Sequence, residues 1–366
     1  MPPESPRVTE NTVTTPRTVV SPTEAIGVDE LCERADRALA EGRFQAALSD
    51  YERVLELDEQ GPFVVRATFG AATAHDMLGK HALALAGYQR VALEFPSATQ
   101  AHAARVRSVR LLVHLERYDE AGQTARALLE GKGASSLRPL EAIAAYGAVA
   151  LDHAARGDDE GAYRYVERGR NIVDTERLDP GGVIPRDLAA LGYAAGEVRR
   201  LRAERITFDP VPENFPAKLE ERCQLLLDAQ SAYSDAMRAE DAHWSAMAGF
   251  RVGELYERLH TDVLRVPPPP EANTEARRQL FEGAMRLRYS ILLEKAKTMM
   301  KHTLAMVERT REPTPWAERA RASEEAIERA ILREKDALAR LPYTREELQA
   351  ALEDLKNKAE RAGERR

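Results

Sequence analysis

The chain has 366 residues, of which 43% are hydrophobic and 31% charged, and it carries a formal net charge of −7. This length exceeds what one compact core usually holds and accommodates two domains, while the mild acidic excess argues against a nucleic-acid-binding protein, whose domain would usually be basic. Ala, Leu, Glu and Arg dominate over strand-forming residues, so we expect an all-α protein.

The first 25 residues are rich in Pro and Thr, which predicts a disordered tail. They lack the apolar segment of a signal peptide, and no part of the chain has the roughly 20 apolar residues that a membrane-spanning helix needs. Two locations stay open. If Met1 is the native start, the protein is cytoplasmic; alternatively, a tail of this kind follows the lipidated cysteine of an exported protein whose leader has been removed.

Three segments that follow the tail repeat one another: 41–61, 78–98 and 115–131. Small residues recur in them at an equal interval, at Ala47, Ala84 and Ala121, and tyrosines follow four residues later in the first two. Glycines mark the turn between helices in the first two segments, and Glu116 departs from that pattern. A fourth, degenerate unit follows around Ala162 after a longer loop.

This pattern resembles the tetratricopeptide repeat (TPR), in which small residues lie where two antiparallel helices approach closely and aromatic residues fill the gap to the next unit. Each helix pair cannot bury its apolar faces alone, so successive pairs stack into a solenoid. The resemblance implies four such units and one extra helix over residues 26–206, with a Pro-rich break at 208–216 as the expected domain boundary.

The C-terminal region, 207–366, is predicted to form long helices with a Pro-rich interruption at 265–273. Thr344 and Glu347 form a capping-box pattern at the start of the last helix. This region is also similar to repeat proteins of the myxobacterial cell envelope, including gliding-motility lipoproteins, in the segments 218–233, 251–260 and 292–306. That resemblance implies a periplasmic or outer-membrane-associated lipoprotein. The long helices themselves are expected to extend the reach of the protein or to associate with a second copy.

The sequence contains no phosphate-binding glycine loop, no HExxH, no CxxC and no GxSxG motif, and its histidine pairs lack metal-ligand spacing. We therefore expect no catalytic site, no metal and no cofactor. Cys32 and Cys223 lie on apolar helix faces and are interpreted as buried thiols. Trp244 and Trp316 are interpreted as core anchors of the C-terminal helices.

The TPR resemblance also implies a partner-binding concave groove lined by the first helix of each unit. The positions that correspond in this sequence are Arg66, Phe69, Met77, Val106, Arg110, Val113, His114 and Leu151, with Asp29, Cys32 and Asp36 at the start. Cys32 and Asp36 replace the Lys and Asn with which one branch of the family holds a terminal carboxylate. The apolar groove would suit an apolar or amphipathic helix.

The predicted function is a non-enzymatic scaffold that binds a partner protein, within a cell-envelope complex for gliding motility or secretion. Two alternatives stay open: a cytoplasmic adaptor that regulates an enzyme or a transcription factor, and a groove that is filled by the protein's own helices.

Overall fold

The computed structural model describes residues 27–131, 134–178, 185–239, 241–310 and 314–363. Every regular element in these ranges is a helix, as the composition and periodicity predict. The expected disordered tail at 1–25 lies outside the described residues. Within the described part of the chain, none of the helices combines the length and the apolar character needed to cross a bilayer.

The chain divides into two compact units, residues 1–79 and 80–366, which are described separately. The division falls at the turn between α3 and α4, inside the second predicted repeat. The expected boundary at 208–216 is instead a connector between α9 and α10, and these two helices pack closely against each other within the second unit. The Pro-rich break therefore marks a loop and not the place where the compact units meet.

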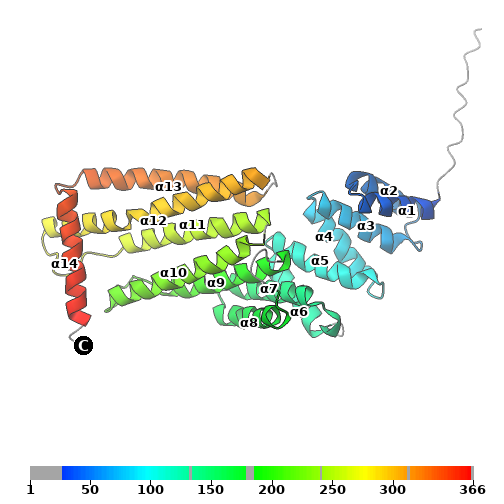
Figure 1. Cartoon of the computed structure of the whole chain (residues 1–366), viewed down its shortest axis with the longest axis horizontal. Helices are drawn as coiled ribbons and strands as arrows, with labels where there is room; N and C mark the ends of the chain where they lie inside the picture. The colour runs from blue at the N-terminus through cyan, green and yellow to red at the C-terminus, as the bar shows by residue number, and fades with distance from the viewer. Residues whose placement is uncertain (1–26, 132–133, 179–184, 240, 311–313, 364–366) are drawn as a thin grey trace, which may run out of the picture. The chain divides into compact units, whose positions relative to one another are not determined.

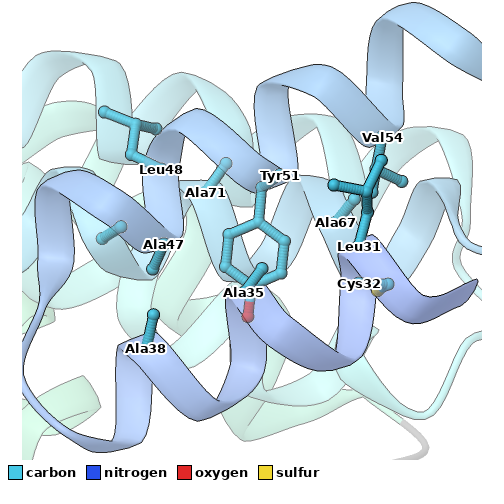
Figure 2. Close-up of a cluster of buried hydrophobic side chains, with 11 residues drawn as sticks. Leu31, Cys32, Ala35, Ala38, Ala47, Leu48, Tyr51, Val54, Ala67 and Ala71 are labelled. Atoms are coloured by element: carbon cyan, nitrogen blue, oxygen red, sulfur yellow. The ribbon is translucent and has the colours of Figure 1, made fainter. Parts of the chain in front are cut away.

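The first unit contains α1 (Val28–Ala40), α2 (Phe44–Leu57) and α3 (Val64–Met77). The small residues Ala35 and Ala47 are fully buried where α1 meets α2, and Tyr51 fills the space between these helices and α3 (Figure 2). Cys32 lies in the same cluster with no exposed surface, so its interpretation as a buried thiol is confirmed. Alanine at the crossing lets the helix backbones approach while the tyrosine ring supplies the buried apolar area.

In the second unit, paired helices continue the repeat pattern. The helices are α4 (His81–Glu94), α5 (Gln100–His114), α6 (Tyr118–Glu130), α7 (Pro139–Ala155), α8 (Asp159–Glu176) and α9 (Ala189–Arg205), with short 3-10 turns at Ala134–Ser136 (η1) and Arg186–Leu188 (η2). Ala84, Ala121 and Ala162 have no exposed surface, so the register of small residues is confirmed. The fold is a TPR-like solenoid of antiparallel helix pairs followed by long C-terminal helices.

The turns between successive helices explain the glycine pattern. Gly42, Gly79 and Gly157 have φ between 72° and 76°, a left-handed conformation that glycine adopts at little cost. Glu116 occupies the equivalent turn with φ of 58°. A residue with a Cβ atom costs roughly 1 kcal/mol in this conformation, so the departure from glycine at position 116 is a local cost that the surrounding packing offsets.

The long helices are α10 (Phe215–Met237), α11 (Ala242–Leu264), α12 (Glu275–Thr310), α13 (Pro315–Ala339) and α14 (Arg345–Gly363). Helices α10 to α13 run alongside one another, and α14 crosses the end of this layer against α12 (Figure 1). Trp244 and Trp316 are 8% and 2% exposed, which confirms them as core anchors. The predicted capping box is present, since the Glu347 amide donates to the Thr344 hydroxyl and the Thr344 amide to the Glu347 carboxylate.

Candidate functional site

The predicted groove residues of the first unit lie along one face of α3. Arg66 donates from Nε to Asp36 at 2.6 Å, and Asp36 also accepts a hydrogen bond from the Tyr51 hydroxyl. Phe69 is half-buried, and Met77 is 57% exposed at the end of the helix. The spacing of these positions, three and then eight residues apart, places them on one side of a 3.6-residue helix.

Val106, Val113 and Leu151 do not line an open groove in the second unit. Their side chains are 5%, 2% and 1% exposed. The prediction of groove-lining side chains at these three positions is wrong, because α5 packs against α4, α6 and α7, and α7 is further covered by α8 and α9. Periodicity identified an apolar face, but it did not distinguish a face for a partner from a face for the protein's own next helices.

The two polar groove candidates of the second unit are engaged by the chain itself. Arg110 forms an ion pair with Asp187 of η2, at 2.8 Å between Nη2 and Oδ1. His114 stacks on His243 of α11, with ring centroids 3.8 Å apart and planes inclined by 25°, and also contacts His81 of α4 at 4.2 Å. In this unit, segments that follow in the sequence therefore occupy the predicted site, which is the alternative that the sequence left open.

Within the histidine stack, His243 is buried and uncharged at neutral pH. His243 is 6% exposed, and the Thr314 hydroxyl lies 3.4 Å from its Nδ1. Burial, with smaller contributions from His81 and Arg319, lowers the pKa of His243 to about 4. An uncharged imidazole can stack closely on a second ring, whereas two charged rings at this distance would repel.

A pocket of about 290 Å³ lies where α6, α7, α9 and α11 meet in the second unit. The aliphatic part of its wall consists of Leu151, Ala154, Ala155 and Leu201. The polar part consists of Tyr118, Tyr193, Glu197, Arg200 and Arg251. Small-molecule sites combine an apolar wall with a few convergent polar groups in this way, although this volume is at the low end of their range of about 300–1,000 Å³.

Glu197 is the centre of the polar side. It is 6% exposed, and its Oε1 accepts a hydrogen bond from the Tyr233 hydroxyl at 2.6 Å. Its Oε2 accepts from Nη2 of Arg200 at 2.6 Å, and Nε of Arg251 lies 3.3 Å from Oε1. Burial opposes ionisation, but Arg251 and Arg200 outweigh it and hold the pKa of the Glu197 carboxyl below its usual value. The carboxylate is therefore charged and fully engaged.

Sequence reasoning missed this network. Glu197 follows Gly196 in a segment of small residues on α9, and Arg251 is more than fifty positions further along the chain. A signal did exist, because a glutamate within the run AAGEV interrupts an otherwise buried helix face. The identity of its partners could not be read from the sequence, since ion pairs between distant helices have no fixed spacing.

The described residues contain no group of three or more His, Cys, Asp or Glu side chains placed to hold a metal ion. The pocket offers no nucleophile paired with a base, since its carboxylate is saturated by arginines and by Tyr233. The lining of the pocket presents hydrogen-bond donors and apolar side chains.

No protein-family model matches the chain, and no curated protein matches it in sequence. Among solved structures, a tetratricopeptide repeat protein from Parabacteroides merdae aligns over 76% of this chain and 93% of its own, with 13% identity and a TM-score of 0.41. The TPR-like repeats of a Podosopora anserina protein described as a kinesin light chain align over 58% of this chain and 96% of theirs, with 15% identity and a TM-score of 0.38. Both TM-scores are below 0.5. The fold is therefore assigned from the helix pairs of the structure and not from these alignments.

Proposed function

We propose that this protein is a non-enzymatic scaffold that binds a segment of a partner protein. The observation that carries the proposal is the surface of α3, where Phe69 and the largely exposed Met77 lie on one face beside the Arg66–Asp36 ion pair. An apolar stripe with a charged end suits an amphipathic helix, whose apolar residues also recur every three or four positions. The second unit supplies no comparable surface at Val106, Val113 or Leu151, so partner binding is assigned to the first unit.

A photo-crosslinking amino acid at position 77 tests this assignment. The same amino acid at Leu332, which is 61% exposed on α13, provides a matched control in the second unit. A discrete crosslinked partner at position 77, absent at 332 and lost when Phe69 is changed to Asp, supports the proposal. Equal crosslinking at both positions, or no effect of Phe69→Asp, contradicts it.

The finer proposal is that the scaffold belongs to a bacterial cell-envelope complex for motility or secretion and is held at the membrane as a lipoprotein. It is supported by the similarity of the segments 218–233, 251–260 and 292–306 to envelope repeat proteins and by the Pro/Thr-rich composition of the first 25 residues. Metabolic labelling with a palmitate analogue, followed by fractionation, tests it. Unlabelled protein in the cytoplasmic fraction would favour the adaptor alternative.

The long helices are proposed to mediate self-association. Leu227, Ile291 and Leu332 are more than half exposed on α10, α12 and α13. Apolar side chains of this size on long helices are common at helix–helix interfaces. Sedimentation of wild-type protein and of a variant with Asp at these three positions would decide this point, since a monomer in both cases contradicts self-association.

A second candidate function is a regulated cytoplasmic adaptor, and the pocket favours it. A scaffold needs no internal cavity, whereas an adaptor that senses a small molecule does. Binding of a small molecule that changes partner capture would favour this candidate over a constitutive scaffold.

A further inference from the structure

The pocket of the second unit has more hydrogen-bond donors than acceptors. Both oxygens of Glu197 accept hydrogen bonds from the protein. Oε1 accepts from the Tyr233 hydroxyl at 2.6 Å. Oε2 accepts from Nη2 and Nε of Arg200 at 2.6 and 3.1 Å. Among the lining side chains, the carboxylate is the strongest acceptor. A cationic ligand would therefore find no carboxylate oxygen that is not already engaged.

Arg251 supplies the first set of donors. Its Nε donates to the Tyr193 hydroxyl at 3.0 Å, and its Nη1 donates to Glu254 at 2.5 Å. Within the part of the chain that the structure describes, its Nη2 makes no hydrogen bond. The Arg251 side chain is 27% exposed, so the N–H donors that the protein does not use can bind water or a ligand in the pocket.

Two tyrosine hydroxyls supply the other donors. The oxygen of Tyr193 accepts from Arg251, and among the described residues no acceptor takes its proton. Tyr118 points to the sulfur of Met247 at 3.8 Å, which is a weak acceptor. Burial raises the pKa of both tyrosines well above the usual value, so both hydroxyls keep their protons. Arg251, Tyr193 and Tyr118 thus offer donors to whatever occupies the pocket.

The polar lining favours a ligand that accepts hydrogen bonds. Two guanidinium groups and one carboxylate line the pocket, while Glu254 and Glu204, which lie outside the lining, also pair with these arginines, so the guanidinium charges are compensated within the protein. The aliphatic part of the wall, Leu151, Ala154, Ala155 and Leu201, has no polar side chain. We propose that the pocket binds a small organic acid, whose carboxylate accepts hydrogen bonds from Arg251 and the two tyrosines and whose short apolar body lies against the aliphatic wall.

This site is independent of the proposed scaffold function, since it lies in the second unit and uses none of the residues assigned to partner binding. Its volume of about 290 Å³ suits a ligand of the size of hexanoate or phenylacetate. A water-filled pocket is the competing description, and it predicts no preference between ligand charges.

Isothermal titration and saturation-transfer NMR with the full chain test the proposal. The probes are hexanoate and phenylacetate, with hexan-1-ol as the neutral match and hexylamine as the cationic match. The proposal expects saturable binding of the carboxylates, binding of the alcohol weaker by roughly tenfold or more, and no binding of the amine. Equal binding of all probes, or binding of none, overturns it.

Two variants examine the polar and the aliphatic lining of the pocket. Tyr118→Phe removes one donor and is expected to weaken carboxylate binding about three- to tenfold without changing binding of the alcohol. Ala155→Leu adds bulk at the exposed edge of the aliphatic lining and is expected to weaken binding of both. Ala127→Leu, on an exposed position of α6 outside the pocket, is the matched control and should bind as wild type. Wild-type affinity in both Tyr118→Phe and Ala155→Leu contradicts the proposal.

Discussion

Each unit contains a tyrosine that covers a glycine of the neighbouring helix and donates a hydrogen bond to a carboxylate, which in turn is held by arginine. In the first unit the tyrosine is Tyr51, over Gly70, and the carboxylate and arginine are Asp36 and Arg66. In the second unit the corresponding residues are Tyr233, Gly196, Glu197, Arg200 and Arg251. Both tyrosines have no exposed surface.

The two groups differ in the burial of their charges. The side chains of Asp36 and Arg66 are 37% and 41% exposed, whereas those of Glu197 and Arg200 are 8% and 14% exposed. Water can solvate the first pair when it is broken but not the second. A tyrosine, a carboxylate and an arginine therefore form a surface ion pair in one unit and, in the other, a buried network that lines the pocket.

The largest expected effect is from Glu197→Ala. The change removes the counter-ion that Arg200 and Arg251 share and the acceptor of the Tyr233 hydroxyl, while Glu204 and Glu254 still pair with the arginines. Removal of one partner from a buried pair typically costs about 3–5 kcal/mol, and we expect the lower end of this range. Urea unfolding followed by tryptophan fluorescence reports on this unit, because both tryptophans, Trp244 and Trp316, lie in it. A loss below about 1 kcal/mol would mean that the Glu197 network, although more buried, contributes no more to stability than the Asp36–Arg66 pair.

The second effect concerns pH and the histidine stack. The pKa of His243 is about 4 in the folded chain, below the ordinary value of 6.5, so only the unfolded chain takes up this proton between these pH values. The contribution of neutral His243 is fully present above pH 6.5, decreases as the pH falls, and is lost near pH 4, by roughly 3 kcal/mol in total.

The measurement is the difference in unfolding free energy between wild type and His243→Phe, taken from pH 7.5 to pH 4.5. Using this difference removes the titration of carboxylates that both proteins share. The same change at His302, which is exposed on α12, provides the control for the substitution itself. If the difference in unfolding free energy between wild type and His243→Phe does not change with pH, the His243 imidazole is not buried in the stack.

The third prediction sharpens the comparison by testing packing apart from charge. A Cβ atom on Gly70 would lie 2.3 Å from the Tyr51 ring, and one on Gly196 would lie 2.5 Å from the Tyr233 ring. Because both rings are fully buried, Gly70→Ala and Gly196→Ala should each destabilise their unit by about 1–3 kcal/mol. Hydrogen exchange of α2 and α3 measures the destabilisation by Gly70→Ala. Unfolding followed by tryptophan fluorescence measures the destabilisation by Gly196→Ala.

A double-mutant cycle supplies the control for the glycine variants. In a Tyr233→Leu background, the smaller side chain leaves room for the new methyl group, so the cost of Gly196→Ala should largely disappear. If the cost persists, the strain does not arise from the tyrosine ring.

The smallest effect is expected from Asp36→Ala. Arg66 is partly exposed and can be solvated after the change, so the loss is expected to be about 1 kcal/mol, mainly from the hydrogen bond of Tyr51. Hydrogen exchange of α1 and α2 measures it, with Glu56→Ala, from an exposed ion pair with Arg53, as the control. If Asp36→Ala destabilises its unit as much as Glu197→Ala does, the burial of the charges does not determine their contribution to stability.

The elements that sequence reasoning predicted correctly depend on neighbours in the chain. The equal interval of Ala47, Ala84 and Ala121 identified the helix crossings, and Thr344 with Glu347 identified a helix start. The candidate site was predicted less well. Phe69 and Met77 lie on a common helix face, but Val106, Val113 and Leu151 are buried, because an apolar stripe is the same in sequence whether a partner or the next helix covers it.

The sequence by itself determined the all-α fold class, the start of the last helix at Thr344, and which small residues lie at the helix crossings, because these properties follow from periodicity and capping over a few residues. Only the tertiary structure decided that His81, His114 and His243 stack and that Glu197 joins Arg251 beside a pocket. These contacts join helices far apart in the chain, and the angles at which helices pack, not the spacing of residues, bring them together.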